Sequence, residues 1–137
     1  MIVVDSSVWI DYFNGTASPE TDKLDALLGV EPLAVGDLIL AEVLQGFRLD
    51  ADYETAKSLM SSLIVVEMLG EANAIKCAEN YRALRKRGVT IRKTIDVFIA
   101  TYCIENKCPL LFEDKDFLPF VEHLGLLPAI KSASGCA

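Results

Sequence analysis

Four acidic residues stand where they could do chemistry together. Asp5 directly follows an apolar run at residues 2–4, and Asp114 comes shortly after another at 110–112. Parallel strands end at one edge of a sheet, where ligands collect in open α/β folds, so we expect both carboxylates there. Glu42 and Asp96 lie in predicted helices, from which their side chains can reach that edge. The four acids form one candidate site.

Each acid also has a purely structural explanation. Asp5 can serve as the N-cap of a helix, and Glu42 can be a solvated surface side chain. Asp96 falls in the first turn of a predicted helix, where a carboxylate gains from the helix dipole. Whether the acids lie together in space decides between a structural and a metal-binding role. Clustered carboxylates repel each other unless a cation or a proton joins them.

The residue types indicate which cation that would be. The chain has one His and four Cys, without a C-x-x-C pair, so a zinc ligand set is missing. Carboxylate oxygens favour a hard cation, Mg²⁺ or Mn²⁺. Such an ion activates water and neutralises charge on a phosphate. The acids predict metal-dependent phosphoryl transfer, with one metal or two.

Basic residues are concentrated in one stretch of an otherwise acidic chain. The net charge is −7, yet six of the 13 Lys and Arg residues fall between positions 82 and 93. A local basic patch can hold a polyanionic backbone. The alternative is a solvated helix end, where cations offset the carbonyl dipole. The six residues are Arg82, Arg85, Lys86, Arg87, Arg92 and Lys93.

The elements that must position these residues follow from the apolar pattern. Short apolar runs predict buried strands at 2–4, 33–35, 64–66 and 110–112. Strands and helices alternate, which predicts an α/β fold with a mostly parallel central sheet of about five short strands and helices on both faces. Helices are expected at 6–13, 20–28, 38–47, 53–63, 71–87 and 94–106, with a further short helix or edge strand at 119–127.

Length and composition set the remaining limits. A chain of 137 residues suits a single domain, expected over 1–130, with a flexible tail at 131–137. Hydrophobic residues make up 52%, and the mean hydropathy is +0.33, which suggests surface buried against another chain. No apolar run approaches the roughly 18 residues of a membrane helix, and we see no signal peptide. A cytoplasmic protein without membrane contact is expected.

Four segments together resemble the PIN-domain ribonucleases, and among them the VapC-type toxins of toxin–antitoxin pairs. They read VDSSVWIDYF at the start, LAEVLQG around Glu42, TIDVFIATYC around Asp96 and LLFEDKDF around Asp114. The resemblance covers residues 2 to about 127. It implies a magnesium-dependent endoribonuclease that acts on structured RNA such as transfer RNA. It also implies a homodimer, inhibited by a VapB-type antitoxin whose helix and C-terminal segment cover the site.

The resemblance also implies roles for single residues. The acids that would bind the metal are Asp5, Glu42, Asp96 and Asp114. Asp116 would support them, and Ser6 matches a small hydroxyl residue that steadies a carboxylate or a water molecule. The chain departs from many relatives just before the fourth acid, where Phe112 and Glu113 replace Thr, Ser or His.

Two other functions remain open at this point. A PIN-like fold can act as an RNA-binding module that does not cleave. A response-regulator-like phosphoacceptor domain also gathers acids around Mg²⁺, but it needs an Asp after a middle strand. The strand predicted at 64–66 is followed by Glu67 and Met68 instead.

Overall fold

The computed structural model describes residues 1–130, so the tail expected at 131–137 lies outside the described residues. Within them, four strands form one parallel sheet in the order β3-β2-β1-β4. The strands are β1 (Ile2–Val4), β2 (Leu33–Gly36), β3 (Ile64–Val66) and β4 (Leu110–Leu111). An isolated parallel bridge from Leu110 to Pro128 continues the sheet beyond β4. The α/β fold with a parallel sheet is confirmed, with four strands where about five were expected.

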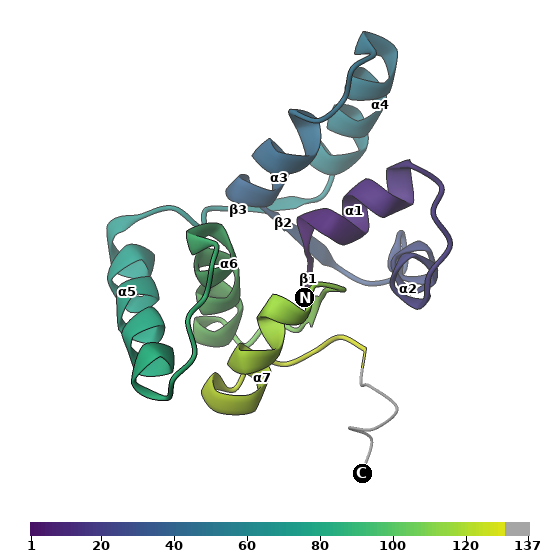
Figure 1. Ribbon diagram of the computed structural model, residues 1–137. Coiled ribbons are helices and arrows are strands. Elements are labelled where there is room, and N and C mark those ends of the chain that lie inside the picture. The colour runs from purple at the N-terminus through teal and green to yellow at the C-terminus, as the bar shows by residue number, and fades with distance from the viewer. Residues whose placement is uncertain (131–137) are drawn as a thin grey trace.

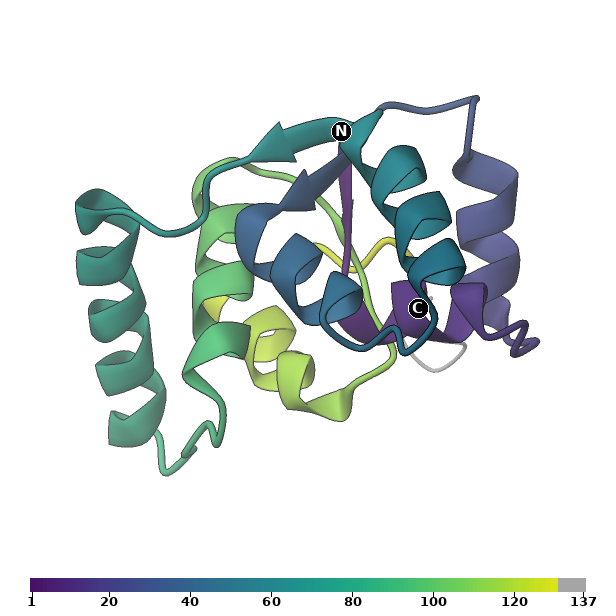
Figure 2. The same ribbon diagram turned by 90° about the horizontal axis from the view of Figure 1, so that it is seen from above.

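Helices enclose the sheet on two sides, as Figure 1 shows, with α1 to α4 grouped on one side and α5 to α7 on the other. Figure 2 shows α5 and α2 at opposite ends of the molecule. No helix of the described residues is both long and apolar enough to cross a membrane. The helices are α1 (Ser6–Phe13), α2 (Pro19–Leu27), α3 (Asp37–Leu44), α4 (Asp50–Ser61), α5 (Glu71–Lys86), α6 (Thr94–Glu105) and α7 (Leu118–Leu124). The 3-10 turn η1 (Lys115–Phe117) directly precedes α7.

The first strand is the centre of the fold. β1 pairs with β2 on one side and with β4 on the other, and Val3 and Val4 have no exposed surface. Trp9 in α1 and Phe117 in η1 are equally buried. Because β1 is enclosed in this way, the residue that follows it is held firmly at the carboxyl edge of the sheet.

The third strand corrects one prediction. The run at 64–66 was expected to be a buried strand, but Ile64 is 49% and Val65 48% exposed. β3 is the edge strand, and it pairs with β2 alone. A run of β-branched residues predicts strand formation, whereas burial depends on the strand's place in the sheet.

Two residues at the end of β2 fit closely against the segment that follows β3. Asp37 accepts hydrogen bonds from the backbone amides of Leu38 at 2.9 Å and Met68 at 2.8 Å. Gly36 leaves no room for a side chain, because a Cβ atom there would overlap the buried side chain of Met68. These contacts fix the start of α3.

A glycine turn returns the chain from α5 toward the sheet edge. Gly88 has φ +82°, a conformation that only glycine adopts without cost. The backbone amide of Val89 then donates to the carbonyl of Leu84 at 3.0 Å. Ile91, only 7% exposed, anchors the segment beyond the turn. Residues 92 and 93 therefore lie at the start of α6 and not along α5.

Candidate metal centre

Three carboxylates from two segments of the chain meet beside the end of β4. Asp96 lies in the first turn of α6, while Asp114 and Asp116 belong to the segment that follows β4. One oxygen atom from each lies within 4.8 Å of the other two. Asp116, expected only in a supporting role, lies in the same oxygen cluster as two of the four predicted acids.

Asp5 stands at the carboxyl edge between β1 and β4. Its backbone amide donates to the carbonyl of Leu111 at 2.9 Å, and its side chain is 6% exposed. It occupies the N-cap position of α1, and its Oδ2 accepts a 2.8 Å hydrogen bond from the hydroxyl of Ser7. Burial raises the pKa of Asp5, and the bond from Ser7 opposes that rise. The carboxylate is held in one orientation at an unfavourable place for a charge.

Glu42, in α3, lies close enough to Asp5 for its charge to raise the pKa of Asp5. The hydroxyl of Ser6 donates to Oε1 of Glu42 at 2.7 Å, which joins α1 to α3. Ser6 is 6% exposed, so its hydroxyl has little access to water. The structure therefore pairs Ser6 with a carboxylate, one of the two partners considered from the sequence.

The environment of Asp96 is both buried and negatively charged. It is 6% exposed, and its Oδ2 is buried without a hydrogen-bond partner among the described residues. Burial raises the pKa of Asp96 to about 7, and the charges of Asp5, Asp114 and Glu42 add to the rise, while Lys93 opposes it. The charges of Asp5 and Glu42 thus reach Asp96, but among the described residues the two lie outside the oxygen cluster that Asp96 forms with Asp114 and Asp116.

Two of the basic residues lie at this site. Nη2 of Arg92 is 3.3 Å from Oδ2 of Asp116, and Nζ of Lys93 is 3.8 Å from Oδ2 of Asp114. The sequence pattern did not indicate that these cations would pair with the acids. Their place depends on the turn at Gly88.

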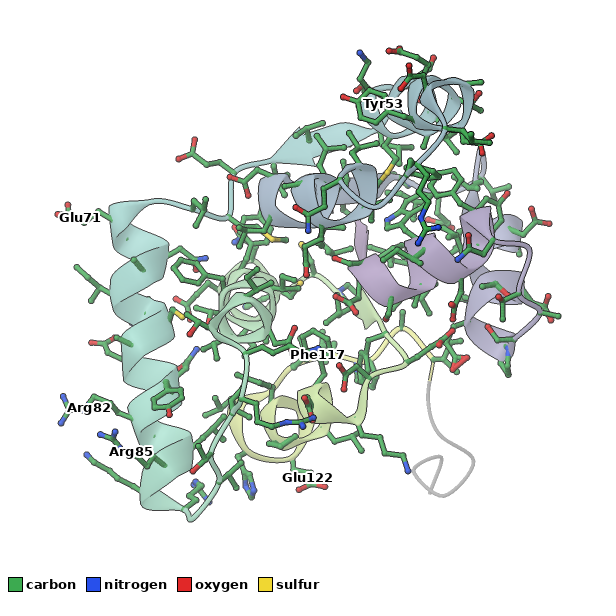
Figure 3. All side chains as sticks on the ribbon, turned by 45° about the horizontal axis from the view of Figure 1, so that its top comes forward. Tyr53, Glu71, Arg82, Arg85, Phe117 and Glu122 are labelled. Atoms are coloured by element: carbon green, nitrogen blue, oxygen red, sulfur yellow. The ribbon has the colours of Figure 1, made fainter. Side chains whose placement is uncertain are left out.

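The other four basic residues lie elsewhere. Arg82, Lys86 and Arg87 line an open hollow with Glu79 near the C-terminal end of α5. The guanidinium of Arg85 lies 5.7 Å from the centre of the Tyr81 ring. Figure 3 shows Arg82 and Arg85 directed outward from α5. The basic stretch, continuous in sequence, is divided into two groups in space.

Glu113 takes no part in the oxygen cluster. Its Oε1 accepts a 3.1 Å hydrogen bond from the hydroxyl of Ser18, the N-cap residue of α2. Burial raises the pKa of Glu113, and so does a hydrogen bond with Asp11. The residue ties the segment after β4 to α1 and α2.

The donors of the cluster fit a hard divalent cation. All are carboxylate oxygens, the donor type that Mg²⁺ and Mn²⁺ prefer. The unpartnered Oδ2 of Asp96 is the strongest sign, because a buried polar atom without a partner is costly. A cation there would offset both the burial and the neighbouring negative charges that raise the pKa of Asp96.

Sequence reasoning missed Ser7, which holds Asp5. A hydroxyl residue two positions after a strand-end acid was the available signal. Only the structure assigns Ser6 to Glu42 and Ser7 to Asp5.

Comparison with known proteins identifies the class. The family model of the PIN domain matches residues 2–120. Ribonuclease VapC11 of Mycobacterium tuberculosis is 30% identical over 119 residues, which cover 85% of this chain and 89% of that protein. Ribonuclease VapC1 of Methanocaldococcus jannaschii is 28% identical over 125 residues, covering 91% of this chain and 84% of that one. The chain therefore belongs to the PIN domain family. Within that family, the chain groups with the VapC ribonucleases.

Solved structures agree on the fold. VapBC2 of Rickettsia felis, bound to a DNA fragment from its promoter, superposes with a TM-score of 0.72 at 16% identity, covering 93% of this chain and 97% of that one. FitAcB of Neisseria gonorrhoeae superposes with a TM-score of 0.68 at 14% identity, covering 87% of this chain and 92% of that one. At these identities the likeness concerns the fold alone.

Proposed function

We propose that this chain is a metal-dependent endoribonuclease, the toxin of a type II toxin–antitoxin pair, and that it hydrolyses phosphodiester bonds in structured RNA such as transfer RNA. The observation that carries the proposal is the buried, unpartnered oxygen of Asp96 among several other carboxylates. Family membership supports it, since the matched relatives are ribonucleases.

Mg²⁺ or Mn²⁺ is the cofactor that these donors suit. Asp5, Glu42, Asp96 and Asp114 would hold it, with Asp116 beside them. When bound, the ion lowers the pKa of a coordinated water and neutralises charge that builds on the phosphate oxygens. The protein's own part is to hold the carboxylates close together and oriented; burial raises the pKa of Asp5 and Asp96, and a bound cation would favour their ionised forms.

The two serines after β1 provide that orientation. Ser7 directs one oxygen of Asp5, and Ser6 directs one oxygen of Glu42. A carboxylate that accepts a fixed hydrogen bond keeps its remaining lone pairs aimed at one place. Both serines are positioning residues in this proposal.

The basic residues would bind the RNA backbone in two places. Each Lys or Arg that contacts a phosphate releases counterions and adds affinity without sequence preference. The group on α5 is open to solvent, and the second group lies beside the acids. The proposed RNA contacts are Arg82, Arg85, Lys86, Arg87, Arg92 and Lys93.

A VapB-type antitoxin is the proposed protein partner. Two structural neighbours are described as toxin–antitoxin or VapBC assemblies, one from Klebsiella pneumoniae and one from Rickettsia felis. An apolar hollow of ≈ 100 Å³ between α1 and α3, lined by Ile10, Phe13, Val43 and Phe47, has room for one apolar side chain of a docked helix. A homodimer that acts in the cytoplasm completes the proposal.

Cleavage by the purified protein tests the function. We expect Mg²⁺ or Mn²⁺ to support cleavage of total transfer RNA and EDTA to stop it. Asp5→Ala and Asp96→Asn should abolish it, because each removes a carboxylate from the site. Asp22→Asn, in an exposed residue of α2, is the matched control and should cleave normally. Full cleavage in EDTA would overturn the proposal.

The same experiment separates the non-cleaving alternative. Metal-dependent binding to a broad panel of RNAs without any cleavage would indicate an RNA-binding module. Sequencing of the 5′ ends that arise after brief expression in cells would identify the RNA and the cleavage position.

A further inference from the structure

Two exposed cations are paired with acids of the candidate metal centre. Arg92 contacts Asp116 at 3.3 Å, and Lys93 contacts Asp114 at 3.8 Å. The side chains of the two cations are 78% and 62% exposed. Exposed ion pairs contribute little to stability and exchange partners readily. The acids are less exposed, Asp116 26% and Asp114 30%, so each pair lies at the rim of the cluster with its cation on the solvent side.

Both partners of these cations belong to the oxygen cluster. Asp114 and Asp116 each place an oxygen within 4.8 Å of the other and of Asp96. Arg92 and Lys93 together carry the same formal charge as one divalent ion. A cation this close to the cluster lowers the attraction of the site for a metal ion.

The chain positions the two cations firmly even though their side chains are free to move. Ile91 is buried just before them, and the backbone amide of Asp96 donates to the carbonyl of Lys93 at 3.1 Å. Their Cα atoms therefore stay at the rim of the site. A side chain released from Asp114 or Asp116 therefore remains beside the oxygen cluster.

We propose that Arg92 and Lys93 change partners when the metal binds. Without metal, they neutralise Asp116 and Asp114. With metal, both side chains are released and bind phosphate groups of the RNA that enters the site. Metal binding and RNA binding then strengthen each other through these two residues, because linkage is reciprocal. This inference rests on the proposed function.

Metal binding measured without RNA gives the first test. By titration calorimetry, Arg92→Gln/Lys93→Gln should bind Mn²⁺ roughly three- to tenfold more tightly than the wild type, because two competing charges are gone. The matched control is Arg82→Gln/Lys86→Gln, which removes the same charge from α5 and should change the affinity less than about twofold. Arg92→Lys/Lys93→Arg keeps both charges and should bind like the wild type.

RNA binding gives the second test. The probe is a fluorescein-labelled RNA stem-loop with phosphorothioate linkages, which keeps the backbone charge and resists cleavage. In anisotropy titrations, Mg²⁺ should raise the affinity of the wild type for this probe. The increase should be several-fold smaller for Arg92→Gln/Lys93→Gln, since the released cations are missing.

The outcomes separate this inference from the proposed function. A wild-type protein that binds no Mn²⁺ would overturn both. A wild type that binds Mn²⁺, combined with a 92/93 double variant that binds it no more tightly than the α5 control, would overturn the inference and leave the function standing. An equal Mg²⁺ effect on RNA binding in wild type and variant would do the same.

Discussion

The hydroxyl of Ser6 lies 2.7 Å from Oε1 of Glu42, a residue 36 positions later in the chain. This hydrogen bond joins the first turn of α1 to α3 and brings two helices into the candidate metal centre. A buried hydroxyl that serves one carboxylate can be removed without removing the carboxylate. A substitution of Ser6 therefore tests how the orientation of Glu42 affects cleavage while the charge of Glu42 stays in place.

Ser6→Ala should lower cleavage without unfolding the protein. A hydrogen bond to a charged group contributes about 1.5–3 kcal/mol, so we expect a loss of roughly tenfold or more in kcat/KM. The free energy of unfolding should fall by no more than about the same 1.5–3 kcal/mol, because one hydrogen bond is lost and Ala fits the space. Ser58→Ala, in an exposed residue of α4, is the control. Equal kcat/KM values for Ser6→Ala and wild type would show that Glu42 needs no support from Ser6.

Asp96→Asn should stabilise the metal-free protein. The carboxylate of Asp96 is buried among other acids, and an amide removes that charge and can donate hydrogen bonds to its neighbours. In EDTA at pH 8 we expect the free energy of unfolding to rise by about 1 kcal/mol or more. Urea titration measures it, with Asp22→Asn as the control. A destabilised Asp96→Asn protein would mean that its carboxylate has a favourable partner.

The metal-free protein should lose stability as the pH rises. Burial and neighbouring charges raise the pKa of Asp96 to about 7 in the folded protein, against 3.8 for a solvent-exposed Asp side chain, so the folded state binds a proton more readily than the unfolded state. The stability from this proton is complete below pH 3.8 and is lost as the pH approaches and passes 7. Asp5, whose pKa is also raised, acts in the same direction.

Urea titrations in EDTA at pH 5 and pH 8 check this dependence. The wild type should be more stable at the lower pH, and Asp96→Asn should show a much smaller difference. Added Mn²⁺ should restore stability at pH 8, because the ionised carboxylates then have a cation. A pH dependence that is the same in both proteins would assign it to other groups.

The basic group on α5 should bind RNA without affecting the metal. Arg82→Gln/Lys86→Gln removes two cations from the open face of α5. We expect weaker binding to transfer RNA and a slope of log affinity against log salt that is smaller by about 1–2. Fluorescence anisotropy at several salt concentrations measures both quantities. An unchanged slope would place the RNA away from this face.

Gly36→Ala should destabilise the fold at the end of β2. A Cβ atom there would overlap the side chain of Met68, which is fully buried and has little room to move. Overpacking of this kind costs about 1–3 kcal/mol. Gly15→Ala removes a glycine with φ +75° but no neighbour within 4 Å, so it separates backbone strain from packing. Thermal unfolding measures the Tm of both variants. Gly36→Ala should lower the Tm through overpacking against Met68, whereas any decrease for Gly15→Ala comes from backbone strain alone.

The strand-end acids could be predicted from sequence because their signal is local. An unbroken apolar run forms a buried strand, and a carboxylate that follows it is placed at the sheet edge. This reasoning predicts that Asp5 and Asp114 lie at the carboxyl edge of the sheet. The same reasoning was wrong about the burial of Ile64 and Val65, because strand order depends on pairing between distant segments.

The basic stretch shows the opposite limit. Six cations within twelve residues suggested one patch, but the turn at Gly88 sends Arg92 and Lys93 to the acids and leaves the others on α5. A glycine after a helix predicts that the helix ends. It does not predict where the following residues go.

The sequence by itself determined the alternation of strands and helices, the oxygen-only set of donors and the positions of Asp5, Asp96 and Asp114 near element ends. Each of these depends on residues close together in the chain. The tertiary structure alone decided that β1 lies between β2 and β4, that Ser6 serves Glu42 while Ser7 serves Asp5, and that two cations face the cluster. These are contacts between distant segments, and they form only when the whole core packs around β1.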